Sequence, residues 1–133
     1  MKNLIKLKIA TILSFLLIIY PGKLAVFNGV TIFIGLIVNI MELFYPEGNF
    51  IKALPSLIYV IIMILSIILL LKNNKYINLI CVLIQYTSLI YMFQIKFLKY
   101  WYYTLPTSIY FILSLTLLYF IFVKKEIKNK VDL

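Results

Sequence analysis

Four long apolar runs, separated by short lysine-bearing segments, constrain this chain more than any other feature. They cover residues 24–45, 54–71, 76–95 and 101–123, and the one formally charged side chain inside them is Glu42. A helix needs about 20 mostly apolar residues to cross the hydrocarbon core of a bilayer, so each run is long enough or nearly so. The sequence therefore predicts an all-α integral membrane protein, built as a bundle of four transmembrane helices.

The composition leaves little room for anything outside the membrane. The chain has 133 residues, of which 65% are hydrophobic and 13% charged, whereas charged residues make up roughly a quarter of an ordinary soluble domain. The longest strongly polar segment is the basic tail 124–133. We therefore expect a single membrane domain over residues 1–133, with this tail in the cytoplasm.

The N-terminal segment 1–23 is harder to assign. Its apolar part, residues 9–20, has twelve residues and is too short for a comfortable membrane crossing. A cleaved signal peptide is a poor match, because a site ending at Ala25 would put Lys23 at the −3 position, where a small residue is needed. We predict an interfacial, re-entrant or additional helix here.

The lysines indicate an even number of crossings. With four spans and a cytoplasmic N-terminus, ten lysines lie on the cytoplasmic side and three on the other, as the positive-inside rule favours. A fifth span at residues 9–20 would change the split to six against seven. We therefore predict a multi-pass protein of the cell membrane with both termini cytoplasmic. In the four-span arrangement, the ten lysines on the cytoplasmic side are Lys2, Lys6, Lys8, Lys23, Lys72, Lys75, Lys124, Lys125, Lys128 and Lys130. The three lysines on the other side are Lys52, Lys96 and Lys99.

An aromatic cluster precedes the last run. Tyr100, Trp101, Tyr102 and Tyr103 are consecutive, and amphipathic rings prefer the headgroup level of a bilayer. The cluster predicts the outer membrane interface; a ligand platform is the alternative.

Polar and small side chains recur at helical spacing within the apolar runs. On the first run, the polar or small residues Asn28, Thr31, Gly35, Asn39 and Glu42 follow one another at spacings of 3, 4, 4 and 3. At 100° per residue, they share an arc of about 80° on one face of a helix. Such a face must look toward protein or water, because buried amides in lipid need partners. It can serve helix packing, a hydrated path or an oligomer interface. The candidate intramembrane polar stripe consists of Asn28, Thr31, Gly35, Asn39 and Glu42 on the first run and Asn78, Gln85 and Ser88 on the third.

Two short segments resemble each other. Residues 54–59 and 105–110 both read Leu-Pro and end in Ile-Tyr, 51 residues apart. Either two helix hairpins arose by duplication, or both helix starts converged on proline in the first turn, where its missing N–H costs little.

The residues for catalysis are scarce. The chain has no histidine and no arginine, and Cys81 is its single cysteine, so histidine-based acid–base chemistry and bidentate arginine contacts are not available. We expect no enzyme activity, no cofactor and no metal site. Nucleic acid is not an expected partner either, because the net charge of +9 comes from lysines at the ends of apolar helices.

Two classes of function remain. The first is a non-catalytic accessory, assembly, immunity-type or sensor protein that acts through helix–helix contacts in the bilayer, with itself or with a membrane partner protein. The alternative is a small oligomeric transporter or channel, its path lined by Asn39, Glu42 and Gln85 on the runs 24–45 and 76–95. Abundant Ile and Asn beside an all-lysine basic set is typical of a bacterial, AT-rich genome.

Overall fold

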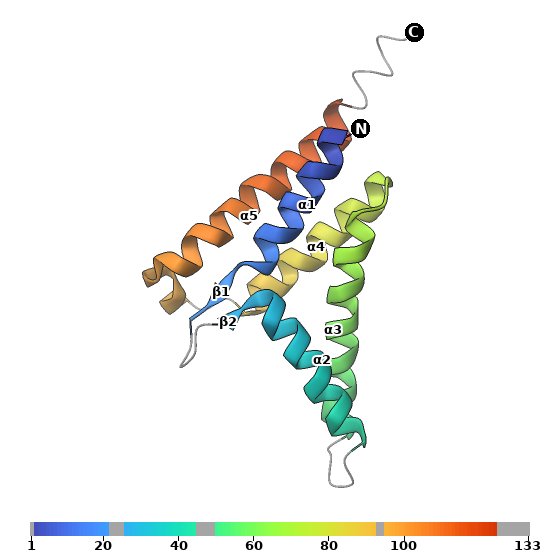
Figure 1. The fold of residues 1–133 in the computed structure, drawn as a ribbon, viewed down its shortest axis with the longest axis vertical. Coiled ribbons are helices and arrows are strands. Elements are labelled where there is room, and N and C mark those ends of the chain that lie inside the picture. Colours follow the sequence, from blue (N-terminus) through green and yellow to red (C-terminus); the bar gives the residue numbers. More distant parts are fainter. Residues whose placement is uncertain (1, 22–25, 45–49, 93–94, 125–133) are drawn as a thin grey trace.

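The computed structural model describes residues 2–21, 26–44, 50–92 and 95–124, which are mostly helical (Figure 1). The predicted all-α class is confirmed for this part of the chain. Its elements are α1 Lys2–Leu16, β1 Ile19–Tyr20, β2 Val26–Phe27, α2 Asn28–Phe44, α3 Phe50–Leu70, α4 Lys75–Met92, the 3₁₀ helix η1 Ile95–Lys99, α5 Trp101–Tyr119 and the π-helical turn η2 Phe120–Lys124.

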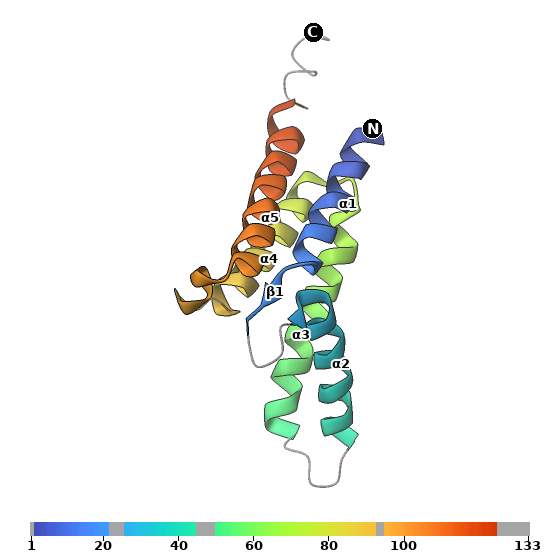
Figure 2. The same cartoon turned by 60° about the vertical axis from the view of Figure 1, so that its left-hand side comes forward.

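The helices form two connected groups (Figures 1 and 2). Helix α1 lies antiparallel beside α5, and α4 passes close to both. Helices α2 and α3 form a hairpin that continues beyond the α1–α5 pair at one end of the molecule. The upper part of α3 packs on α4, so that α3 and α4 connect the two groups.

Helix α1 is a full packing element, although its apolar segment is short. Lys8, Thr11, Phe15 and Ile18 are spaced by 3, 4 and 3 residues, and each side chain is fully buried. This spacing puts them on one face of a helix, and that face meets α5 and α4. The N-terminal segment therefore contains a helix, Lys2–Leu16, and this helix contributes to the core.

A small antiparallel hairpin joins α1 to α2. Ile19 pairs with Phe27 and Tyr20 with Val26, and the N–H of Asn28 donates to the carbonyl of Ile18 at 2.7 Å. Pro21 follows β1 directly and cannot continue a helix. Helix α2 begins at Asn28, directly after β2 and later than the start of the apolar run at residue 24, because Val26 and Phe27 are paired with β1.

Pro55 and Pro106 lie inside α3 and α5, not in their first turns. We predicted first-turn prolines, and that position is wrong because α3 already begins at Phe50 and α5 at Trp101. The first residues of α3 and α5 are 51 positions apart in the sequence, and so are Pro55 and Pro106. The two helices therefore place proline in the same register, as the resemblance between residues 54–59 and 105–110 suggests.

Among the described residues, two helices are long and apolar enough to cross a membrane by length and composition. They are Ala53–Leu70, with a mean hydropathy of 2.7, and Trp101–Val123, with a mean hydropathy of 1.9. Helix α2 is apolar but has 17 residues. Its surface and those of α3 and α5 expose many large apolar side chains, including Phe33, Phe44 and Ile112.

Candidate functional site

Polar side chains of α4 make hydrogen bonds to both neighbouring helices. The hydroxyl of Tyr59 on α3 donates to Oγ of Ser88 at 2.7 Å. On the other side, the hydroxyl of Tyr110 on α5 donates to Oε1 of Gln85 at 2.8 Å. Gln85 and Ser88, two members of the predicted polar stripe, are therefore brought together at the centre of the packed helices.

A second tyrosine strengthens the junction between α4 and α5. Tyr86 and Ser114 share a hydrogen bond of 2.7 Å between their hydroxyls. The ring of Tyr110 lies 5.8 Å from that of Tyr86 and 5.3 Å from that of Phe15 on α1. Aromatic rings thus fill the space where α1, α4 and α5 meet, and their hydroxyls satisfy polar groups that an apolar core would leave unpaired.

Two polar atoms on α4 have no hydrogen-bond partner among the described residues. They are Nε2 of Gln85 and Oδ1 of Asn78, and both side chains are nearly or fully buried. Seven residues separate them, so they lie on the same face of α4, two turns apart. Leaving a buried donor or acceptor unpaired costs about 1–3 kcal/mol. The polar groups of the α4 stripe are therefore only partly paired within the described part of the chain.

The most distinctive buried group is Lys8 of α1. Its side chain is fully buried, and Nζ donates to the backbone carbonyl of Lys72 at 2.6 Å, at the end of α3. On the same helix, Thr11 donates to the carbonyl of Leu7 and Ser14 to that of Thr11. This buried face of α1 was not predicted. The 3, 4, 3 spacing of Lys8, Thr11, Phe15 and Ile18 is the sequence signal that could have revealed it.

The α2 part of the predicted stripe makes its hydrogen bonds elsewhere. Nδ2 of Asn28 donates to the carbonyl of Phe15 at 3.1 Å and so joins α2 to the end of α1. Nδ2 of Asn39 donates to the carbonyl of Gly35 at 2.6 Å, and Thr31 donates to that of Phe27. These bonds go to α1, to β2 and to α2 itself rather than to α4.

The two remaining α2 members differ in their surroundings. Gly35 faces α3: a Cβ added there would lie 3.5 Å from Cγ2 of Val60. Glu42 is exposed on the surface of α2. The stripe therefore combines an internal packing face with one outward carboxylate.

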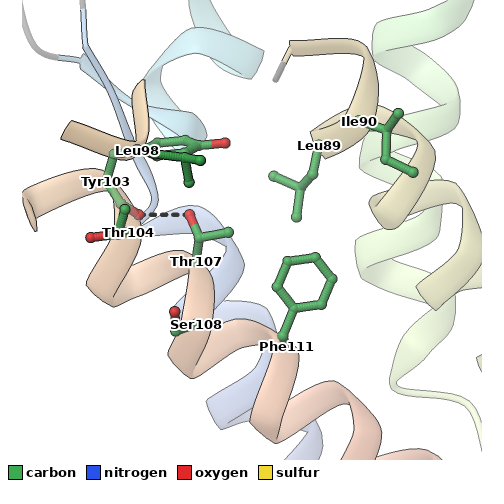
Figure 3. Close-up of a pocket in the computed structure, with 8 residues that line it drawn as sticks. All are labelled: Leu89, Ile90, Leu98, Tyr103, Thr104, Thr107, Ser108 and Phe111. Atoms are coloured by element: carbon green, nitrogen blue, oxygen red, sulfur yellow. Dashed lines mark hydrogen bonds between the residues drawn. The ribbon is translucent and has the colours of Figure 1, made fainter. Parts of the chain in front are cut away.

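A pocket of about 270 Å³ lies between the end of α4 and the start of α5 (Figure 3). Helix α4 contributes Leu89 and Ile90, and η1 contributes Leu98. The α5 residues are Tyr103, Thr104, Thr107, Ser108 and Phe111.

Comparisons give no precedent for this arrangement: the chain matches no family model, no curated protein and no solved structure. Within the described residues, no group of three or more His, Cys, Asp or Glu side chains is close enough to hold a metal ion.

Proposed function

We propose that this chain is a multi-pass membrane protein that acts without catalysis, as an accessory, assembly, immunity-type or sensor component that binds a membrane partner protein through one helix surface. Both termini lie in the cytoplasm in this proposal.

Contacts at the two ends of the helices support the topology. Lys8 of α1 reaches the end of α3 at Lys72, and Nζ of Lys75 at the start of α4 lies 5.8 Å from the ring of Phe122 in η2. Three lysine-bearing ends thus share one side of the molecule, as expected for a cytoplasmic face.

At the opposite end, aromatic contacts join the β-hairpin, η1 and the start of α5. The ring of Tyr103 lies 5.9 Å from that of Tyr20 and 5.5 Å from that of Phe97. Aromatic side chains are enriched where helices leave the hydrocarbon core, so this end fits the outer interface.

The same contacts suggest how α1 and α2 fit into an even number of crossings. Helix α1 leads from the Lys72 end to the Tyr103 end, and α2 continues away from it before α3 returns. We propose that α1 makes the outward passage and that the β-hairpin lies at the outer interface, where the pairing of β1 with β2 satisfies backbone groups of both strands. Helix α2 continues beyond this interface, and α3, α4 and α5 make the three remaining passages.

Glu42 is the observation that carries the partner-binding function. It lies among exposed apolar side chains on α2, with Met41 59% exposed and Phe44 84% exposed. A carboxylate on an apolar surface that a partner covers is costly to bury unless the partner supplies a cation or hydrogen-bond donors. A membrane protein packed on this face of α2 would supply them.

The test is the mass of the tagged protein's complex, purified from its own membrane in mild detergent. We expect a stable complex with a different protein. Glu42→Gln should weaken it by at least about tenfold, because a buried charge pair loses one member. Thr87→Val is the matched control, since Thr87 is exposed on α4 and donates to the carbonyl of Ile84. A purely monomeric wild-type protein would contradict the proposal.

The unpaired atoms of Asn78 and Gln85 favour one alternative, a small oligomeric transporter or channel with a hydrated path along α4. In that case the purified protein is a homo-oligomer with a defined number of subunits. Gln85→Leu then abolishes proton or monovalent-cation flux into liposomes, while the oligomer keeps its mass. Flux that is unchanged in this variant would remove Gln85 from the path.

A further inference from the structure

The pocket between α4 and α5 has an apolar interior. Leu89 and Tyr103 are almost fully buried within it. Two of its hydroxyl groups already have backbone acceptors: Thr107 donates to the carbonyl of Tyr103 at 2.7 Å (Figure 3), and Thr104 lies 3.3 Å from the carbonyls of Tyr100 and Trp101. The pocket therefore offers few free polar groups and suits a hydrocarbon ligand.

The rim of this pocket is accessible from outside the helices. Ile90 is 71% exposed and Leu98 is 56% exposed, and they border it from α4 and η1. The start of α5, with Tyr100 and Trp101, belongs to the aromatic cluster that we assign to the membrane interface. Thr104 lies one turn further into α5, about 5 Å along the axis. A ligand entering from the bilayer would therefore reach the pocket just below the headgroups.

The charge beside the rim is positive. Lys99 follows Leu98 directly and is exposed. A flexible ammonium at the interface attracts anionic lipid headgroups. The pocket's volume of about 270 Å³ equals about nine water-sized volumes of ~30 Å³. This is room for part of one acyl chain and not for a whole lipid.

From these observations we propose that the α4–α5 pocket binds the acyl chain of one anionic phospholipid, with the headgroup at Lys99. The inference rests on the membrane insertion proposed above. It assigns the pocket a specific lipid, distinct from the lipid that surrounds any membrane helix without preference.

The single tryptophan of the chain, Trp101, reports on this site. The full-length protein is reconstituted in phosphatidylcholine vesicles that contain a rising fraction of phosphatidylglycerol brominated in its acyl chains. Trp101 fluorescence is compared with that in vesicles containing the same fraction of brominated phosphatidylcholine. One lysine contact predicts about fivefold preferential association of the anionic lipid, seen as steeper quenching at low fractions.

Two variants separate the headgroup from the acyl chain. Lys99→Gln should lower the ratio of phosphatidylglycerol to phosphatidylcholine association to about one. Ser108→Phe should fill the pocket and remove the steep component for the anionic lipid. Ser56→Phe is its matched control, because Ser56 is exposed on α3 and follows Pro55, much as Ser108 lies two residues after Pro106.

The outcomes distinguish this inference from the one it rests on. Equal quenching by both brominated lipids would mean surrounding lipid only, and would overturn the site while leaving membrane insertion intact. No quenching by either lipid would overturn both proposals. A steep component that survives Ser108→Phe would place the lipid outside the pocket and refute the assignment.

Discussion

The ammonium of Lys8 lies 2.6 Å from the carbonyl oxygen of Lys72 and ties α1 to the end of α3. Lys72 lies two residues beyond the last residue of α3, so its carbonyl is outside the hydrogen-bond ladder of that helix, and a cation near this end also interacts favourably with the helix dipole. A lysine that sequence reasoning assigns to topology alone thus has a structural role as well. It holds together the two groups of helices.

Lys8→Met should lower the stability of the protein in detergent by about 1–3 kcal/mol, because it removes a charge-assisted hydrogen bond and keeps most of the methylene packing. The measurement is thermal unfolding in one mild detergent, followed by circular dichroism. Lys6→Met is the control: Lys6 is exposed, so the change should stay within about 0.5 kcal/mol. Equal effects of the two substitutions would show that the Lys8 contact contributes nothing.

A double-mutant cycle can measure the Tyr110–Gln85 bond. Tyr110→Phe leaves Oε1 of Gln85 without its donor and should cost about 1 kcal/mol, in the range found for hydrogen bonds between membrane helices. Gln85→Leu also removes the unpaired Nε2, so the double variant should recover part of the loss. Unfolding in detergent gives the coupling, expected at about 0.5–1.5 kcal/mol.

Tyr119→Phe provides the reference for this cycle, since Tyr119 is on the same helix and 58% exposed. It should leave stability unchanged within about 0.5 kcal/mol. A coupling energy near zero between Tyr110 and Gln85 would mean that their hydrogen bond makes no net contribution to stability, because other partners replace it when it is removed.

Sequence periodicity predicted the α4 site better than the rest of the fold. Gln85 and Ser88 sit on one face of a long apolar run, and the rule that buried amides need partners predicts interhelical bonds, which Tyr110 and Tyr59 supply. Which tyrosines would do so depends on how the helices pack, and a single sequence does not contain that information.

The first 27 residues illustrate what local pattern misses. The run 9–20 is short, and its length alone left open an interfacial, re-entrant or additional helix. The pairing of Tyr20 with Val26 sets where α2 begins, yet two-residue strands leave no periodic signal. Similarly, Glu42 shares a helical stripe with Asn39 by spacing, but it is exposed while Asn39 is buried. The α2 stripe covers an arc of about 80° around the helix, which is wide enough to include a side chain on the packed face and another at the exposed border of that face.

Cysteine labelling tests the proposed topology. In a Cys81→Ser background, we expect Asn3→Cys and Asn73→Cys to resist a membrane-impermeant maleimide in intact cells and to react after permeabilisation. Lys99→Cys should react in both. All three positions are exposed. Asn73 is chosen over Asn74, whose Oδ1 accepts from the N–H groups of Tyr76 and Ile77 at the start of α4. Labelling of Asn3→Cys in intact cells would contradict a cytoplasmic N-terminus.

The two glycines of α2 are expected to respond differently to alanine. A Cβ at Gly35 would lie 3.5 Å from Cγ2 of Val60, an ordinary contact, whereas one at Gly29 would lie 3.3 Å from Cδ2 of Leu16. Gly35→Ala should therefore stabilise the protein by about 0.5–1 kcal/mol, since alanine loses less backbone entropy in a helix. Gly29→Ala should gain less or nothing, because Leu16 must shift.

The free energy of unfolding of both variants is measured in the same detergent. It shows whether glycine at these positions allows close helix packing or only costs backbone entropy. If Gly35 were kept for close approach of α2 to α3, alanine there would destabilise the hairpin, against the 3.5 Å spacing. Gly35→Leu extends the series, because a larger side chain must displace Val60 and should cost about 1–3 kcal/mol. A gain for alanine followed by a loss for leucine would place the limit of this contact between one methyl group and a branched chain. That order would confirm that α2 and α3 pack at the distance described.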